Sequence, residues 1–192
     1  SGTVGGASGG TITMGDVLMA DGVTLTVGAG AANQIDLDAI TGTAEGAVSS
    51  LTINSTGVVD VAEAVGTDIG TVTITNSGGT TFNSTVGAAT FTLTDTADAA
   101  TVSFLGNVTL SAGMTVSALG RSDAFNVSLT GTTNSIAGAT TFFNTGTLTL
   151  GNGGTDATEF TGGVVATTQT GATNGIVHII DTVLMLPKTF TV

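Results

Sequence analysis

A four-residue phrase recurs six times in this chain, and it restricts the possible folds more than any other feature. The phrase is an apolar residue, a hydroxyl residue, a second apolar residue and a polar residue, and it first occurs at residues 51–54 as Leu-Thr-Ile-Asn. It returns at residues 72–75, 91–94, 108–111, 127–130 and, with Gly151 in the last place, 148–151, at intervals of 17 to 21 residues. A degenerate repeat of about 20 residues is typical of proteins that stack short strands coil upon coil.

The alternation within the phrase predicts which residues are buried. Successive side chains of a strand point to opposite faces, so the second apolar residue of every phrase belongs to one buried face and its hydroxyl neighbours lie outside. These predicted core residues are Ile53, Ile74, Leu93, Leu110, Leu129 and Leu150. Weaker strands lie between the phrases, separated by clusters of Gly, Asn, Ser and Asp such as residues 76–79 and 151–154. We therefore expect two or three strands in each coil, with residues 140–143 supplying an extra strand or lengthening one coil.

The repeat predicts an all-β chain folded as a right-handed β-solenoid, a parallel β-helix with coils of about 20 residues. The alternative is a β-sandwich or jelly roll, which also has short strands and frequent turns but does not require one phrase to recur six times. We expect one continuous domain, in which residues 1–48 form irregular N-terminal coils or a cap and residues 49–170 form the repeats. Residues 171–192 are then an apolar strand segment that caps the stack or pairs with another chain.

The charge of the chain excludes several partners. Fourteen Asp and Glu residues against two Lys and Arg residues give a formal net charge of −12. Nucleic acid binding needs a basic surface, which two isolated cations cannot supply.

No apolar run reaches the roughly 18 residues that span a bilayer, so we expect no membrane insertion. Cysteine is absent, which excludes disulfides and thiol chemistry.

Two parts of the sequence resemble known families. Residues 22–28 and 145–151, with their Thr-Leu-Thr repeats, resemble the β-helical passenger regions of bacterial surface proteins, namely filamentous haemagglutinins and autotransporter adhesins. That resemblance implies a β-helical architecture and an extracellular or cell-surface location, most often bacterial. Residues 174–187, Asn-Gly-Ile-Val-His-Ile-Ile-Asp-Thr-Val-Leu-Met-Leu-Pro, resemble the closing motif of fasciclin-type adhesion domains.

The hydroxyl residues of the phrases form a possible binding surface. If the coils stack, they project outward as a regular array, and such arrays on solenoids are similar to those of ice-binding proteins. The other interpretation is that threonine is simply a good outward residue for a strand. The residues of this expected array are Thr52 with Asn54, Thr73 with Thr75, Thr92 with Thr94, Thr109 with Ser111, and Ser128 with Thr130.

Acidic residues are the candidate metal ligands. Calcium takes six to eight oxygen ligands, and oxygen-rich turns can supply them. Asp36 and Asp38 lie on one face of an expected strand, Asp95 and Asp98 share one turn, and Asp156 follows a glycine-rich turn. Solvated surface carboxylates are the alternative interpretation of all five. No other cofactor is expected.

Catalysis is not expected. Glycoside hydrolysis normally combines paired carboxylates with aromatic sugar platforms, and the chain has no Trp or Tyr. The cations Arg121 and Lys188, which a polysaccharide lyase would need together, are far apart in the sequence. The single histidine, His178, lies three residues before Asp181, which places the two on opposite faces of a strand.

The sequence thus predicts a non-catalytic extracellular structural protein: a subunit of a self-assembling filament, sheath or surface layer, or an adhesin stalk. Its expected partners are further copies of itself, as a homopolymer, and cell-surface glycans. The alternatives are an ice-binding solenoid and a carbohydrate-binding or carbohydrate-cleaving β-helix. The residues expected to mediate self-association are Ile176, Ile179, Val183, Leu184, Leu186 and Phe190.

Overall fold

The computed structural model describes residues 1–117, 123–165, 176–179, 182–184 and 190–191, with side chains described up to residue 165. Within these residues the chain forms 23 short β-strands and no helix. All described strand pairs are parallel. A sandwich or jelly roll would need antiparallel pairs, so the solenoid prediction is confirmed and the alternative is wrong.

The strands form an eight-stranded sheet and a 15-stranded sheet. The smaller sheet, called face one, contains β2 (Thr11–Met14), β5 (Gln34–Leu37), β8 (Val59–Val61), β11 (Thr80–Phe82), β13 (Thr101–Phe104), β15 (Asn126–Leu129), β18 (Thr147–Leu150) and β21 (Ile176–Ile179).

The larger sheet bends around a corner and therefore covers two faces. Face two contains β3 (Val17–Met19), β6 (Ile40–Gly42), β9 (Val65–Gly66), β16 (Thr133–Ile136), β19 (Ala157–Phe160) and β22 (Thr182–Leu184). Face three contains β1 (Gly2–Val4), β4 (Thr24–Val27), β7 (Ser49–Asn54), β10 (Ile69–Asn76), β17 (Thr140–Phe142), β20 (Val164–Val165) and β23 (Phe190–Thr191). Two long strands, β12 (Val86–Leu93) and β14 (Val108–Val116), run from face two onto face three.

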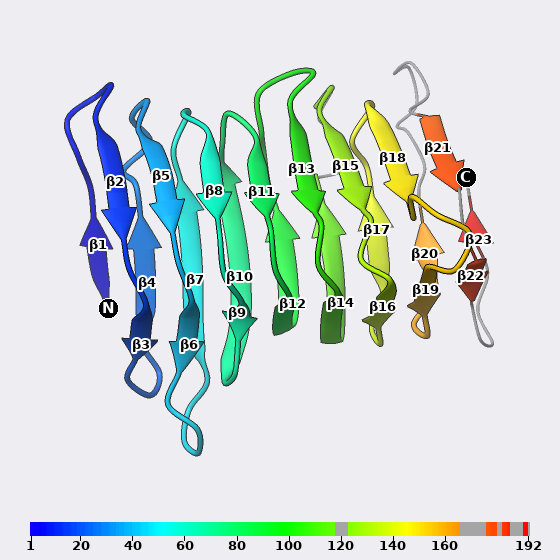
Figure 1. The fold of residues 1–192 in the computed structure, drawn as a ribbon, viewed down its shortest axis with the longest axis horizontal. Helices are drawn as coiled ribbons and strands as arrows, with labels where there is room; N and C mark the ends of the chain where they lie inside the picture. The colour runs from blue at the N-terminus through cyan, green and yellow to red at the C-terminus, as the bar shows by residue number, and fades with distance from the viewer. Residues whose placement is uncertain (118–122, 166–175, 180–181, 185–189, 192) are drawn as a thin grey trace.

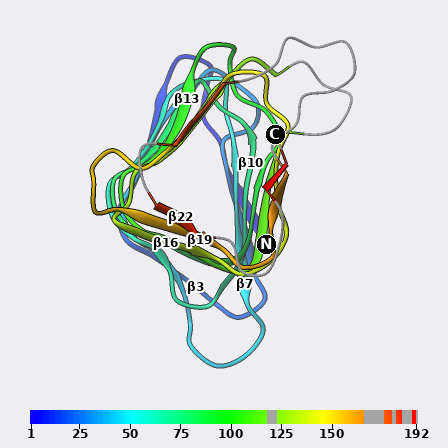
Figure 2. The ribbon, with the colours of Figure 1, turned by 90° about the vertical axis from the view of Figure 1, so that its right-hand side faces the viewer.

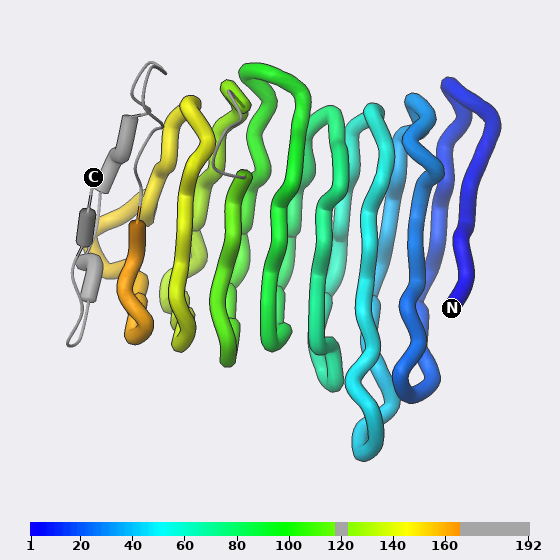
Figure 3. Tube along the Cα trace, turned by 180° about the vertical axis from the view of Figure 1, so that it is seen from behind, coloured from blue at the N-terminus to red at the C-terminus, as the bar shows by residue number. Residues whose placement is uncertain are grey.

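The coils wind as a right-handed solenoid of about seven turns. In Figure 1 the chain rises along the back, descends along the front and advances from left to right, which is a right-handed path. Figure 2 looks along the stack, where the coils overlay into a three-sided outline. The corners after β3 and β6 extend beyond that outline, as the lower loops of Figure 3 show.

The predicted coil length of about 20 residues is too short. On face one, paired residues of adjacent coils are 21 to 25 residues apart in the sequence. The column that shows this is Ile12, Ile35, Val59, Thr80, Val102, Val127 and Leu148. The shorter estimate arose because the phrase occurs on more than one face. Residues 51–54, 72–75 and 91–94 are on face three, but residues 108–111 begin β14 on face two. The last two phrases are in β15 and β18 of face one.

The inward direction of the predicted core residues is confirmed, although they do not share one face. Ile53, Ile74 and Leu93 stack on one another in register, and the next member of their column is Val116 rather than Leu110. All six predicted core residues are nonetheless at most 1% exposed. Alternation therefore predicted burial correctly even where the phrase changed faces.

Phenylalanine side chains fill the middle of the solenoid. Phe82 and Phe104, on adjacent strands of face one, stack with ring centroids 5.0 Å apart. Phe91 comes from face three and meets Phe104 edge to face, also at 5.0 Å. Side chains from two faces of the narrow coil thus meet in one ring cluster, in a chain that has eight Phe and no Trp or Tyr.

Buried polar side chains also form hydrogen bonds between coils. Asn134 is 1% exposed and makes three hydrogen bonds: its Nδ2 donates to the Gly131 carbonyl and to Thr158 Oγ1, and its Oδ1 accepts from the Val108 amide. These bonds join three successive coils. A buried amide that satisfies its neighbours in this way fixes the register of the stack.

Replacing Phe104 by Ala should lower the free energy of unfolding by about 3 to 5 kcal/mol, because it removes a ring that contacts two others in the core. Replacing its outward neighbour Ser103 by Ala should change it by less than about 0.5 kcal/mol. Urea unfolding followed by circular dichroism measures both. Equal losses would contradict the inward and outward assignment.

Candidate functional site: the threonine face

The most regular surface of the molecule lies on face three. We define the threonine face as the outward residues of four consecutive strands, β4, β7, β10 and β12. Each of these strands carries two hydroxyl residues separated by one buried or partly buried apolar residue. The pairs are Thr24 and Thr26, Ser50 and Thr52, Thr71 and Thr73, and Thr90 and Thr92.

The pairs are in register from coil to coil, so they form two columns. In the first column Thr24 pairs with Ser50, Ser50 with Thr71, and Thr71 with Thr90. The second column is longer, since Thr26, Thr52, Thr73 and Thr92 continue to neighbours on both sides. Its seven successive members are Thr3, Thr26, Thr52, Thr73, Thr92, Thr115 and Thr141.

Parallel pairing sets the spacing of the two columns. Strands of a sheet lie about 4.8 Å apart, and residues i and i+2 of one strand are about 6.6 Å apart. The hydroxyls of Thr71 and Thr90 reach each other at 2.9 Å, so neighbouring coils can also share hydrogen bonds. The array contains methyl and hydroxyl groups and no charge, and its threonines on β4 to β12 are half-buried. Such a surface presents a two-dimensional grid of identical groups.

The sequence predicted half of this grid. Thr52, Thr73 and Thr92 are in register as expected. Their expected partners two residues later do not form a second column, because the pairing of β7 with β10 shifts between Ile74 and Asn76. The second column that the structure shows instead lies two residues before Thr52, Thr73 and Thr92 in their strands. Ser50, Thr71 and Thr90 therefore went unrecognised, although their alternation with apolar residues was visible in the sequence.

The other expected hydroxyl residues lie elsewhere. Thr109 is on face two, where it pairs with Ser135. Ser128 is on face one, between Ser103 and Thr149. The prediction that Thr109 and Ser128 belong to the threonine array is therefore wrong, because the repeated phrase occurs on more than one face of the solenoid.

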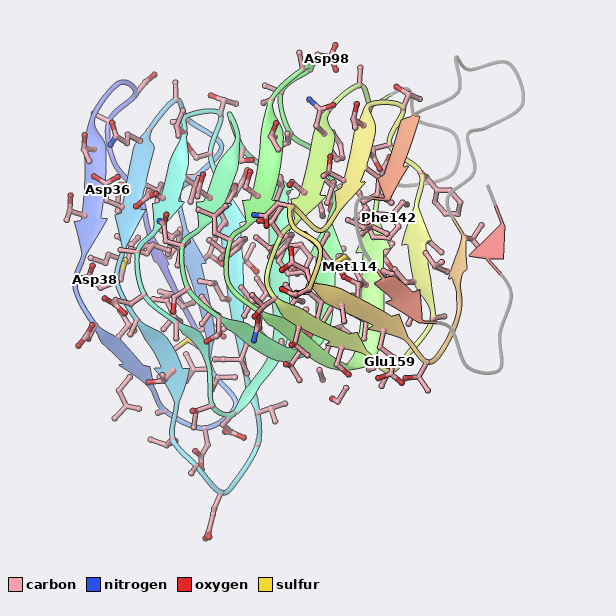
Figure 4. All side chains as sticks on the ribbon, turned by 45° about the vertical axis from the view of Figure 1, so that its right-hand side comes forward. Asp36, Asp38, Asp98, Met114, Phe142 and Glu159 are labelled. Carbon is pink, nitrogen blue, oxygen red and sulfur yellow. The ribbon has the colours of Figure 1, made fainter. Side chains whose placement is uncertain are left out.

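The five candidate calcium ligands are spread over the molecule. Figure 4 shows Asp36 and Asp38 near the N-terminal end of the stack and Asp98 at the crest of a turn above β13. Asp36 is the outward neighbour of Asp60 on β8 in register, a pairing that the sequence did not reveal. Gln34 Nε2 donates to Asp36 Oδ1 at 2.9 Å, and Asn83 Nδ2 donates to Asp60 Oδ1 at 2.9 Å.

The remaining candidate carboxylates hold turns together. Asp95 Oδ1 accepts from the Thr96 amide at 2.8 Å, and Asp98 Oδ1 accepts from the Ala124 amide at 3.3 Å. Asp156 is 5% exposed, and its Oδ2 accepts from the amides of Asn152 and Gly153 at 2.9 and 3.2 Å. In the part of the chain with described side chains, no three carboxylate or imidazole groups come close enough to hold a metal ion. Calcium binding stays a prediction.

The C-terminal candidates continue the stack. Ile176 and Ile179 lie in β21 and pair with Thr147 and Leu150 of β18. Val183 and Leu184 lie in β22, next to β19, and Phe190 lies in β23, next to β20. Leu186 lies outside the described residues, as does Asp181, the possible partner of His178. Self-association through these residues stays a prediction.

No known protein family, curated protein or solved structure matches the chain. Among the described residues there is also no helix of the length and apolar character needed to cross a bilayer.

Replacing Asp156 by Ala should lower the free energy of unfolding by about 1 to 2 kcal/mol, because two turn amides lose their acceptor. The loss should be equal in calcium and in EDTA, measured by thermal unfolding. A loss that appears only in calcium would instead identify Asp156 as a metal ligand.

Proposed function

We propose that this chain is a rod segment of an extracellular or cell-surface protein of bacterial origin, similar in role to the β-helical parts of filamentous haemagglutinins and autotransporter adhesins. The observation that carries the proposal is the continuous parallel pairing from β1 to β23. Such a stack is stiff, because each coil is hydrogen-bonded to the coils before and after it. Its high negative charge keeps it soluble and apart from anionic surfaces. The proposed role is structural and involves no catalysis.

The ends of the stack support assembly along its axis. Within the described residues, β1, β2 and β3 pair on one side only, and so do β21, β22 and β23. Unpaired strand edges can accept further strands, either more coils or a second copy of the chain. Axial continuation of this kind is what we expect for a filament, sheath or surface-layer subunit or for an adhesin stalk. The segment that contains Ile176, Ile179, Val183, Leu184, Leu186 and Phe190 lies at one of these ends.

If copies of the chain associate end to end, the purified protein should form filaments visible by negative-stain electron microscopy. Deleting residues 176–192 should shorten them or abolish them, because the apolar end strands β21 to β23 are replaced at that edge by β18, β19 and β20, whose sequences differ. Replacing Leu105, an apolar residue 51% exposed on the side of the stack, by Ser is the control and should leave assembly unchanged. A strict monomer before the deletion would overturn self-association.

Ice binding is the second candidate function, and the threonine face favours it. Two columns of threonine or serine over four coils place methyl and hydroxyl groups on a regular grid of about 4.8 by 6.6 Å, and a regular array of such groups can order water. The strands of this face are also among the longest, at eight residues in β10 and in β12. Faces one and two carry Asp, Asn and Glu among their outward residues and lack this uniformity.

Replacing Thr73 and Thr92 together by Tyr should abolish any thermal hysteresis and ice shaping of the purified protein, because two rings break the grid at its centre. The matched control is the replacement of Ser103 and Ser128 by Tyr. These two residues also stack in register, but on face one. Both variants should retain the unfolding temperature within a few degrees. Hysteresis that is lost equally in both, or absent from the parent protein, contradicts ice binding.

A further inference from the structure

One row of face two has a leucine at each end and none between them. The row follows the register from coil to coil and takes one position from each strand. Its members are Leu18, Thr41, Gly66, Gly87, Thr109, Ser135, Glu159 and Leu184. Leu18 is 68% exposed, more than any other large apolar residue with a described side chain. A second copy stacked end to end would continue this row and place its Leu18 next to Leu184 of the first copy.

The core columns of face one continue across the same joint. The column that begins at Ile12 reaches Val177, and the column that begins at Met14 reaches Ile179. Met14 is half-buried, whereas Leu37, its neighbour on the next coil, is 1% exposed. The first coil thus lacks a coil before it, and a stacked copy supplies apolar residues at the matching register positions.

Face three has one strand too many for such a joint. Among the described residues it has nine strands, counting β12 and β14, whereas faces one and two have eight each. Its first strand, β1, lies at the left end of the stack in Figure 1, and its last strand is β23. If β21 and β22 of one copy pair with β2 and β3 of the next, β23 arrives at the edge of β4, which β1 already occupies. Only one of β1 and β23 can fill this place.

β1 covers the edge of β4 poorly. It pairs through three residues, Gly2 to Val4, and all three are exposed. Gly2 has no side chain to cover Leu25, which is only half-buried, although the next member of the column, Leu51, is 0% exposed. Phe190 holds the register position of Gly2 at the other end of this column. Exchange of β1 for β23 of another copy therefore replaces a glycine by a phenylalanine at the edge of β4.

The chain that follows β1 is anchored independently of it. Asn33 is fully buried, and its Nδ2 donates to the Ala7 carbonyl at 2.6 Å and to the Gly10 carbonyl at 3.0 Å. Between this anchor and β1 lie only Gly5 and Gly6, and glycine has the least restricted backbone of all residues. β1 can therefore leave β4 by rotation at these two glycines while β2 keeps its place.

We propose that β1 is a displaceable strand that covers the edge to which a second copy of this chain binds. On association, β23 of one copy replaces β1 on β4 of the next, and β21 and β22 pair with β2 and β3. Leu184 of the first copy then lies beside Leu18 of the second. The two ends that meet are different surfaces, so the contact is heterologous and repeats into a linear filament. This joint depends on the end-to-end association proposed above, and it identifies the strands that meet there.

A disulfide that holds β1 in place tests its displacement. Thr3 and Thr26 pair in register, and adjacent strands bring their Cα atoms to about 4.8 Å, within the range that a disulfide spans. The double variant Thr3→Cys with Thr26→Cys should form no filaments when oxidised and should assemble like the parent protein in reductant, as followed by light scattering and electron microscopy. The parent chain has no cysteine, so it serves as the control for the reductant. Equal assembly of the oxidised and reduced forms would overturn the displacement of β1.

Two further variants locate the joint. Deletion of residues 1–4 should shorten the lag before filaments appear, because the edge of β4 is then free. Leu18→Ser should raise the protein concentration needed for assembly by about ten-fold, because the joint loses a buried leucine. The matched control Leu105→Ser removes a leucine that is 51% exposed on the side of the stack, and it should leave that concentration within about two-fold.

The outcomes separate this joint from end-to-end assembly in general. Filaments that form with the lag and the concentration of the parent protein in both variants would overturn the joint and leave end-to-end assembly standing. A chain that stays monomeric in the parent and in every variant would overturn both.

Discussion

The whole molecule depends on one constraint: every coil must return to the register of the coil before it. Parallel strands bond only to their neighbours along the axis, so a coil that came back one residue out of register would expose its apolar side chains and bury its threonines. The stacked columns of Ile53, Ile74 and Leu93 inside and of Thr52, Thr73 and Thr92 outside are two consequences of this single requirement. Buried amides such as Asn134 reinforce it by bonding across coils.

The sequence was sufficient to predict the fold class and the direction of most strand side chains, because alternation is a local property. It was insufficient for the coil length. The phrase of apolar and hydroxyl residues describes any strand with one buried face, and this solenoid has three such faces. The repeat therefore places Leu110 in one column with Leu93, whereas the residue that pairs with Leu93 in the next coil is Val116. Only the pairing of strands identifies which repeats belong to one column.

The candidate sites were less predictable than the fold. The second column expected from the sequence is broken by a shift in pairing after Ile74, and no local pattern marks that position. Asp156 stood out as a metal candidate because it follows glycines, yet the same turn geometry makes it a cap for two backbone amides. Gly66 and Gly87 are 21 residues apart in the sequence, and they lie side by side only because β12 pairs with β9. Neighbours along the axis thus determine the surfaces as well as the core.

The corners of the solenoid absorb nearly all the variation in coil length. The loop after β6 extends well beyond the outline of the stack, while the strands on either side of it keep their pairing. Each coil advances the chain along the axis by one strand spacing, about 4.8 Å, whatever the number of residues in its corners. The reach of such a rod is therefore counted in coils rather than in residues. A lineage of such proteins could enlarge a corner into a new binding loop without moving any other part of the rod.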